Sequence, residues 1–360
     1  MPENLSPSVL IAGGYGVVGS DIARLVRAYH PGIRILLGGR HPEKGRALAE
    51  ELGNAAPVAL DLSGKQPLLA EHEAPGAVIA AVHDSSNRLL DYAISNGAGL
   101  IEIARAGDEL MRAMIFTAQR APKKPVLFSS NWMAGIPAML AREATADMDT
   151  VTRLDMSILF YGKDRGGPDS ATAVDGIDAP FIQRLGQAWQ EVLPMTAPRK
   201  LRFPSGKKAK AYRVNMPDVL TLPLASGAAS ATVRLAVDSP INNFLSMFLL
   251  RSRIWKLIPR ETRRSLVHNP GPGARHEVVI EAEGTGKDGK PAKRRLGLLD
   301  PQGQVHLTAL GVLLQLEQVL GLGGKEPLPA GICFPETAPD FERLHEMLAK
   351  ESVEIKRDRF

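Results

Sequence analysis

The amino-acid sequence predicts an α/β protein, with a doubly wound parallel sheet in its first third and a second α+β domain on a mixed or antiparallel sheet. Up to about residue 130, short apolar runs alternate with amphipathic helical segments, which is the pattern of consecutive β-α-β units. Beyond residue 150, apolar and polar side chains alternate with a period of two, which indicates half-buried strands. A chain of 360 residues is long enough for two such domains.

The composition is that of a globular protein, with 44% hydrophobic and 23% charged residues. The formal net charge of +5 favours an anionic ligand, but the basic residues are dispersed and only 5% of residues are aromatic, so we expect no nucleic-acid partner. Cys333 is the single cysteine, which excludes an intrachain disulfide and a cysteine metal cluster. The sequence has neither a signal-peptide pattern nor an apolar run of membrane-spanning length, so we expect a cytoplasmic protein.

A glycine-rich motif follows the first predicted strand, residues 8–12, and opens a helical pattern. Gly14, Gly16 and Gly19 fit G-x-G-x-x-G, in which the glycines allow a tight turn, close approach to a pyrophosphate and close packing of helix on strand. The N-terminus of the following helix offers free N–H groups to phosphates. The motif therefore predicts a Rossmann dinucleotide site formed by Gly14, Tyr15, Gly16, Val17, Val18 and Gly19.

The second predicted strand, residues 33–37, ends in Gly38-Gly39-Arg40-His41 without the acid that usually binds the ribose 2′-hydroxyl of NAD. Arg40 could pair with the 2′-phosphate of NADP, and Lys44 lies one helical turn further on. We therefore predict NADP(H) rather than NAD(H). The alternative is that Arg40 is a solvated loop residue.

The β-α alternation continues through a helix over 42–52 and strands over 57–60, 76–82, 100–103 and 126–128, with another helix over 86–96. Because ligands bind at the carboxyl ends of such strands, Asp61 is predicted near the adenine and Val82 and His83 near the cofactor.

The second domain begins where Asn131 and Trp132 follow the sixth strand. Asn131 could bind the nicotinamide carboxamide and Trp132 could line the pocket, or the two could be a helix cap and a core residue. Further strands are predicted over 151–158 and 232–237, and a hairpin over 277–299 has its tip at 284–290. A helix over 306–320, a glycine stop at 321–324 and a helix over 339–350 follow, and the polar end from Lys356 is expected to fray.

The predicted domains are thus residues 1–130, 131–305 and 306–360, the last packing its helices on the first. Candidate proton donors are Tyr161, Lys163 and His83, while Arg165 could bind a substrate carboxylate and His306 could face the cleft. The alternative for each of these residues is a structural or solvated role. No metal-binding spacing occurs, so no metal is predicted.

Residues 241–264 form a basic amphipathic pattern with apolar residues along one helical face. The expected role is packing on the sheet or across a dimer interface. The alternatives are an anionic membrane surface or the cover of an apolar substrate tunnel.

With these residues placed, the chain resembles the saccharopine dehydrogenase-like oxidoreductases. The likeness lies in residues 9–19, continued by Gly39-Arg40-His41-Pro42-Glu43-Lys44, and in residues 308–321 and 329–336, whereas 148–305 match nothing specific. The resemblance implies a Rossmann domain, a mixed-sheet second domain, terminal helices that pack back, a homodimer, and NAD(P)H-dependent reduction of C=N or C=C bonds.

The resulting hypothesis is an NADP(H)-dependent oxidoreductase that acts on a small organic substrate. The alternative is a nucleotide-binding sensor, or a membrane-surface protein, without turnover.

Overall fold

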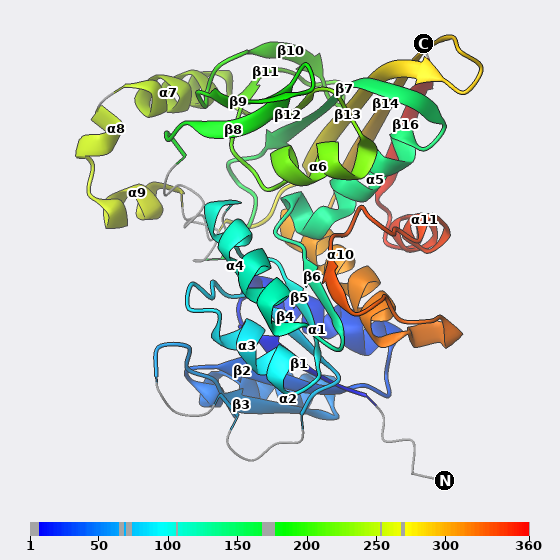
Figure 1. The fold of residues 1–360 in the computed structure, drawn as a ribbon. Helices are drawn as coiled ribbons and strands as arrows, with labels where there is room; N and C mark the ends of the chain where they lie inside the picture. Colours follow the sequence, from blue (N-terminus) through cyan, green and yellow to red (C-terminus); the bar gives the residue numbers. More distant parts are fainter. Residues whose placement is uncertain are drawn as a thin grey trace. The chain divides into compact units, whose positions relative to one another are not determined.

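The computed structural model describes residues 7–64, 68–69, 74–105, 107–167, 177–252, 254–267 and 271–359 (Figure 1). The chain divides into two compact units: unit 1 comprises residues 1–130 and 308–335, and unit 2 comprises residues 131–307 and 336–360. The segment 306–360, expected as one block, is therefore shared between the units, with 308–335 in unit 1 and 336–360 in unit 2.

Unit 1 is built on a seven-stranded sheet in the order β15-β6-β5-β4-β1-β2-β3, in which every pair of neighbours is parallel. The order reverses at β1 and β4, as in a doubly wound dinucleotide-binding fold, which confirms the predicted architecture. The strands are β1 (Ser8–Ala12), β2 (Arg34–Gly39), β3 (Ala55–Ala59), β4 (Ala77–Ala80), β5 (Gly99–Glu102), β6 (Pro125–Phe128) and β15 (Gly331–Cys333).

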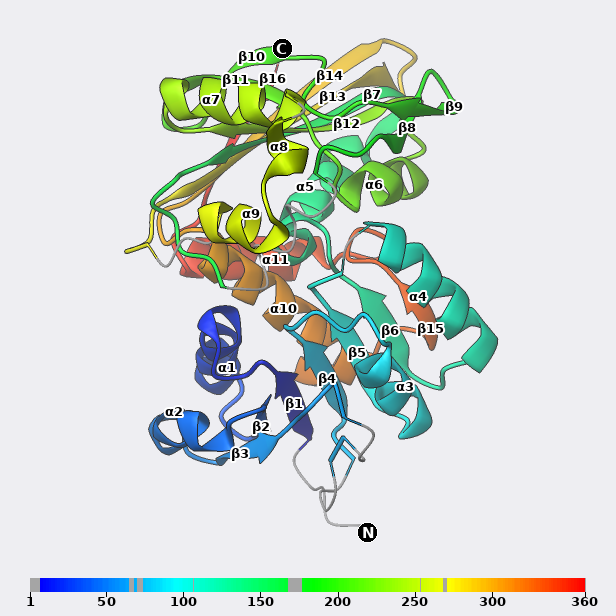
Figure 2. The same cartoon turned by 90° about the vertical axis from the view of Figure 1, so that its left-hand side faces the viewer.

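Helices cover both faces of this sheet (Figure 2), so the central strands are buried on both sides. In α1, Ile22, Ala23 and Val26 are buried, because their spacing places them on the sheet-facing side of the helix. The helical elements are α1 (Val17–Tyr29), η1 (Pro42–Gly45), α2 (Arg46–Leu52), α3 (Arg88–Ser95), α4 (Gly107–Arg120), α10 (Gln304–Leu320), whose first turn belongs to unit 2, and η4 (Leu322–Gly324).

Unit 2 is built on a second seven-stranded sheet in the order β10-β11-β12-β7-β13-β14-β16. Its centre pairs β7 with β12 in parallel and with β13 in antiparallel orientation, which confirms a mixed sheet. The predicted hairpin is also confirmed, because β13 and β14 pair on either side of its tip. The strands are β7 (Met148–Phe160), β10 (Arg199–Arg202), β11 (Lys208–Arg213), β12 (Ala231–Val237), β13 (His276–Gly286), β14 (Pro291–Asp300) and β16 (Glu354–Arg359), with a separate hairpin of β8 (Phe181–Leu185) and β9 (Ala188–Val192).

The helical elements of unit 2 are η2 (Trp132–Gly135), α5 (Ile136–Thr145), α6 (Asp218–Ser226), α7 (Pro240–Arg251), α8 (Ile254–Leu257), α9 (Arg260–Val267) and α11 (Phe341–Lys350). The single helix predicted over 241–264 is wrong, because this stretch forms three short helices. Ser252 ends α7 in an extended conformation, with ψ at 150°. Pro259 then precedes α9, and a proline disfavours a helical conformation at the residue before it.

The prediction that the chain frays from Lys356 is also wrong. Residues of β16 pair with β14 from Leu299↔Glu354 to Arg294↔Arg359. Most side chains of this edge strand are charged and exposed, as is common for strands at a sheet edge, and this polarity conceals the strand in the sequence. None of the described helices combines the length and the apolar character needed to cross a membrane.

Candidate dinucleotide site and polar clusters

The glycine-rich loop joins β1 to α1 through a tight turn at Gly13. Gly13 has a φ of +81°, and its N–H donates to the carbonyl of Gly38 at 2.8 Å. The turn that the sequence pattern assigned to Gly14 therefore lies one residue earlier. Gly14 instead allows close packing on β2, since a Cβ there would lie 2.9 Å from the Cα of Leu37. A Cβ on Gly19 would lie 2.9 Å from the Cα of Gly14, so the first turn of α1 needs glycine to pass over the loop.

The N-terminus of α1 has the features of an anion site. Gly16 is its N-cap in an extended conformation, without a side-chain cap, and the first turn contains no acidic residue. The N–H groups of this turn, which begins with Val17 and Val18, have no acceptor within the helix and lie at the positive end of its dipole. Val82, which follows β4, packs on the loop, since its Cγ1 would lie 2.6 Å from a Cβ on Gly13.

Tyr15 of the glycine-rich loop and two exposed cations lie at the carboxyl end of β2. The hydroxyl of Tyr15 accepts the N–H of His41 at 2.9 Å, and its ring lies where a Cβ on Gly39 would be. Arg40 and Lys44 are exposed, and neither makes an ion pair or a side-chain hydrogen bond within the part of the chain that the structure describes. The geometry thus leaves both cations available to an anionic ligand.

Asp61, which follows β3, is an acidic residue near this end of β2. Hydrogen bonds from Ser63 lower the pKa of its carboxyl, and the charges of Arg88 and Arg40 lower it further. The structure therefore places Asp61 close enough to Arg40 for an electrostatic interaction, although the sequence separates them by a helix and a strand.

A buried polar network lies at the carboxyl ends of β4 and β5. Glu102 accepts a hydrogen bond from Nε of Arg105 at 2.8 Å, Nη2 of Arg105 makes an ion-pair contact with the same oxygen at 2.7 Å, and both side chains are almost fully buried. Burial raises the pKa of Glu102 and outweighs the opposite effect of Arg105. Arg105 also donates to Asn87 at 2.9 Å. The predicted His83 lies near this network, but its Nε2 is paired with Glu109 at 2.5 Å.

In unit 2, Asn131 lies at the centre of a buried cluster with two acids. Its side-chain amide contacts Thr221 at 2.7 Å, Asp218 at 3.3 Å and Glu336 at 3.4 Å. Burial raises the pKa of Asp218 to about 6. Burial and the neighbouring charge of Asp218 raise the pKa of Glu336 to about 7. The side-chain amide nitrogen of Asn131 thus donates to groups of the protein itself. This agrees with the alternative in which Asn131 has a structural role instead of binding the nicotinamide.

The cluster holds an unusual stretch of backbone. Met133, Ala134 and Gly135 follow one another with φ values of 51°, 46° and 78°, in the left-handed region. Two of the three are not glycine, and each such residue costs about 1 kcal/mol or more. The backbone N–H of Trp132 donates to the carboxylate of Asp218 at 2.9 Å. This hydrogen bond holds the backbone in place immediately before the left-handed residues.

Trp132 is fixed by a second contact, with His276. Its indole N–H donates to Nε2 of His276 at 2.8 Å, and the two rings stack with centroids 5.7 Å apart. Since Nε2 accepts, a neutral His276 carries its proton on Nδ1, which faces Asp164 at 3.7 Å. Asp164 in turn accepts the N–H of Gln304 at the start of α10.

The predicted proton donors of unit 2 have different surroundings. The hydroxyl of Tyr161 donates to Glu277 at 2.6 Å. Burial and this contact raise the pKa of Tyr161 to about 12, so its phenol is protonated near neutral pH. Lys163 and Arg165 are exposed residues of the loop that follows Tyr161.

His306, predicted as a substrate contact, lies against two acids. Its Nδ1 lies 2.8 Å from Asp300, and its Nε2 lies 3.5 Å from Glu351. Burial lowers its pKa, but the hydrogen bonds and charges of these carboxylates outweigh that effect, and the net shift is upward.

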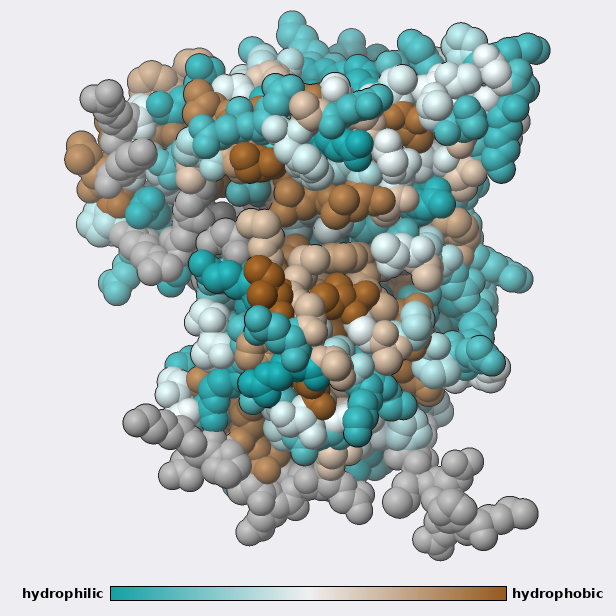
Figure 3. Space-filling model, viewed as in Figure 1, coloured by the Kyte–Doolittle hydropathy of each residue, from teal (hydrophilic) through white to brown (hydrophobic). Residues whose placement is uncertain are grey.

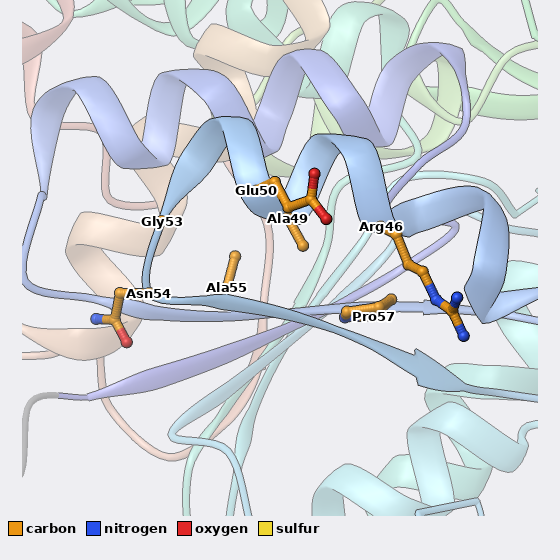
Figure 4. A pocket seen from close by; sticks show the side chains of 7 residues that line it. All are labelled: Arg46, Ala49, Glu50, Gly53, Asn54, Ala55 and Pro57. Atoms are coloured by element: carbon orange, nitrogen blue, oxygen red, sulfur yellow. The ribbon is translucent and has the colours of Figure 1, made fainter.

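No group of histidine, cysteine and acidic side chains within the described residues could hold a metal ion. A shallow hollow lies between α2 and β3 (Figure 4). It is lined at the start of β3 by Gly53, Asn54 and Ala55. Dinucleotides bind at the opposite, carboxyl ends of such strands, so the hollow is not the cofactor site.

The parallel sheet with its glycine-rich loop has the strand order of a dinucleotide-binding Rossmann fold, and a mixed-sheet unit accompanies it. In fold, the chain is similar to apo saccharopine dehydrogenase (L-Glu forming) from Saccharomyces cerevisiae, with a TM-score of 0.68, 13% identity, and coverage of 99% of this chain and 100% of that one. The saccharopine dehydrogenase-like resemblance is thereby confirmed as a likeness of fold.

Two further solved structures align along most of their length at lower scores. Amine dehydrogenase from Mycobacterium smegmatis gives a TM-score of 0.47 at 12% identity, covering 94% of this chain and 98% of that one. Dipicolinate-bound dihydrodipicolinate reductase from Paenisporosarcina sp. TG-14 gives 0.41 at 12% identity, covering 93% and 100%. No protein-family model and no curated protein sequence matches this chain.

Proposed function

We propose that this protein is an NADP(H)-dependent oxidoreductase that transfers a hydride to the C=N or C=C bond of a small organic substrate. The observation that carries the proposal is the end of β2, where Arg40 is exposed beside the glycine-rich loop, pairs with no acid among the described residues, and stands in Gly38-Gly39-Arg40-His41 without an acid. An arginine at this position suits a 2′-phosphate, because its planar guanidinium donates two parallel hydrogen bonds to phosphate oxygens.

The residues of unit 1 divide the binding of such a cofactor among them. The N-terminus of α1, from Gly16 to Gly19, would bind the pyrophosphate, while Gly14 keeps the loop close to β2. Arg40 and Lys44 would bind the 2′-phosphate, and Tyr15 and Asp61 flank the adenosine end. The cofactor supplies a hydride, so the protein has to bind the substrate and provide a proton.

Residues of unit 2 would bind the substrate and provide the proton. Trp132 would contact the nicotinamide, and Asn131, through its bonds to Asp218 and Thr221, fixes the chain that positions Trp132. Arg165 is exposed and could bind a substrate carboxylate, with His306 as a further contact. In a reduction of C=N, carbon receives the hydride and nitrogen the proton.

Tyr161 is our first candidate for the proton donor. Its phenol remains protonated because its pKa is about 12, and Glu277 orients the hydroxyl. Lys163 and His83 are the other candidates, and Glu109 holds the ring of His83. A Tyr161→Phe variant should lower kcat and leave the affinity for NADPH unchanged, which separates a proton donor from a cofactor ligand.

The proposal is tested by calorimetric titration with NADPH and NADH on the wild type and on Arg40→Ala. We expect the wild type to bind NADPH more tightly, and Arg40→Ala to weaken NADPH binding alone by about 1–3 kcal/mol. Arg34→Ala is the matched control, because Arg34 is exposed and is the first residue of β2, at the end of the strand opposite to Arg40. Equal binding of both nucleotides, unaffected by Arg40→Ala, would refute the NADP assignment.

If NADPH binds, its oxidation is then followed with cyclic imines and enoyl compounds as first substrates. Turnover of either class supports the reductase proposal. Nucleotide binding without turnover of any C=N or C=C compound would favour the alternative of a nucleotide-binding sensor.

A further inference from the structure

An exposed apolar surface runs along α7. Ile241, Phe244, Leu245 and Phe248 are 71%, 65%, 54% and 60% exposed. Their spacing of three, four and seven residues places them on one face of the helix. Large side chains of this kind are usually buried, and a contiguous exposed set marks a surface that binds something.

The same surface continues over α8, where Ile254 and Leu257 are 52% and 81% exposed. In Figure 3 hydrophobic residues gather at the outer edge of the molecule over α8. We call the exposed apolar residues of α7 and α8, with Arg251, Arg263 and Arg264, the α7–α9 surface.

The helices of this surface are anchored with their apolar side chains outward. In α7, Ser239 caps the helix, and the side chain of Asn243 accepts from Val237 at 3.1 Å and donates to Lys210 at 2.9 Å. In α8, Trp255 is buried and the guanidinium of Arg263 lies 5.6 Å from its ring centre. The exposed apolar face is therefore held in position by polar contacts on the inner side.

The charge of this surface is one-sided. Residues 240–267 contain six arginine or lysine residues against a single acidic residue, Glu261. This segment therefore carries the entire formal net charge of +5, and the rest of the chain contains equal numbers of basic and acidic residues. Its partner should consequently be both apolar and anionic.

We propose that the α7–α9 surface docks on an anionic phospholipid bilayer. Amphipathic helices with aromatic and aliphatic side chains on one face and basic residues beside them lie in the interface of such membranes. Lipid tails receive the apolar side chains, while acidic headgroups attract the arginines. A second copy of this chain fits less well, because a two-fold contact would bring two equally positive segments together.

The test is co-sedimentation of the full chain with phosphatidylcholine vesicles, either pure or containing about one-third phosphatidylserine. The apolar variant is Phe244→Ser/Phe248→Ser, and its matched control is Met111→Ser/Ile115→Ser, which removes two exposed apolar residues of α4. The charge variant is Arg251→Gln, and its control is Arg202→Gln, an exposed arginine of β10. Thermal melts followed by circular dichroism establish that each variant folds.

We expect the wild type to bind only the vesicles with phosphatidylserine and to be released by salt. Phe244→Ser/Phe248→Ser should weaken binding roughly tenfold or more, and Arg251→Gln about fivefold, while both controls bind as the wild type does. The proposal is overturned if the anionic vesicles are not bound, if pure phosphatidylcholine binds equally, or if the variants bind like their controls. A wild-type dimer that Phe244→Ser/Phe248→Ser dissociates, without vesicle binding, would assign the surface to a second copy instead.

Discussion

The indole N–H of Trp132 donates to Nε2 of His276 at 2.8 Å, across 144 positions of the sequence. Trp132 lies at the start of the left-handed turn, and His276 is the first residue of β13. The bond therefore ties the strained segment to the mixed sheet of unit 2, and with Asp218 it fixes the residue that we propose to contact the nicotinamide.

Replacing His276 with alanine should destabilise unit 2. The side chain is fully buried, so the substitution leaves a cavity and an indole N–H without its acceptor. We expect His276→Ala to lower the free energy of unfolding by about 2–4 kcal/mol in urea denaturation. His41→Ala, at an exposed histidine, should change it by less than about 0.5 kcal/mol. Equal stability of the two variants would show that the Trp132–His276 contact contributes little.

The acids around Asn131 predict a pH dependence of stability. Burial raises the pKa of Glu336 to about 7, whereas a glutamate in the unfolded chain has a pKa of about 4. Between these two pH values the folded state therefore binds more protons than the unfolded state. The stability that the protonated carboxyl contributes is complete below the unfolded pKa and is lost as the pH rises through about 7.

The neutral isostere Glu336→Gln should remove this dependence. We expect the variant to exceed the wild type in unfolding free energy by roughly 1–3 kcal/mol at pH 8, with the difference shrinking toward pH 4. Urea denaturation from about pH 4 to pH 8 measures the unfolding free energies of the wild type and of Glu336→Gln. Glu354→Gln, at an exposed carboxylate, is the control. A pH-independent difference would show that Glu336 does not titrate in this range.

The buried pair of Glu102 and Arg105 should be strongly non-additive. Arg105→Met leaves the Glu102 carboxylate buried without its partner, and we expect a loss of about 3–5 kcal/mol in unfolding free energy. The double variant Glu102→Leu/Arg105→Met removes both charges and should recover most of that loss. The contrary result, a double variant as unstable as the sum of the single ones, would show that each residue acts separately.

Gly19→Ala should disturb the dinucleotide loop directly. The new Cβ would lie 2.8 Å from the carbonyl carbon of Gly13, so the backbone has to move. We expect about 1–3 kcal/mol of destabilisation and loss of NADPH binding in calorimetric titration. Ser20→Ala, which removes a hydroxyl that donates to the carbonyl of Val17 in its own helix, should retain binding. NADPH affinity unchanged in Gly19→Ala would argue against the loop as the phosphate site.

The parallel sheet could be predicted from the sequence because its strands are short apolar runs that end at glycines or polar residues. The predicted strand over residues 8–12 coincides with β1 (Ser8–Ala12), and the others agree within about two residues. β15 has only three residues, too few for any periodicity, and β16 is hidden by its charged side chains. The break between α7 and α9 was missed because the apolar pattern continues through Ser252 and Pro259.

The candidate site was predictable only where it is local in sequence. Tyr15, Gly19 and Arg40 belong to one β-α-β unit, so spacing alone places them near one another. Asp218 and Glu336, in contrast, lie 87 and 205 positions from Asn131 and meet it only through tertiary packing. The spacing of residues in the sequence gives no sign of such a contact. The raised pKa values of Asp218 and Glu336 arise from burial, which depends on the folded structure.

The pairing of β16 with β14 has a consequence for how this protein withstands damage. Without those six residues, the outer side of β14 would present a row of unsatisfied N–H and C=O groups to solvent. Such a row is a template on which strands of other molecules can add, the first step toward insoluble polymers. Proteolytic removal of β16 would therefore lower the solubility of the protein while both proposed binding surfaces stay intact. The charged strand thus protects the sheet edge from self-association.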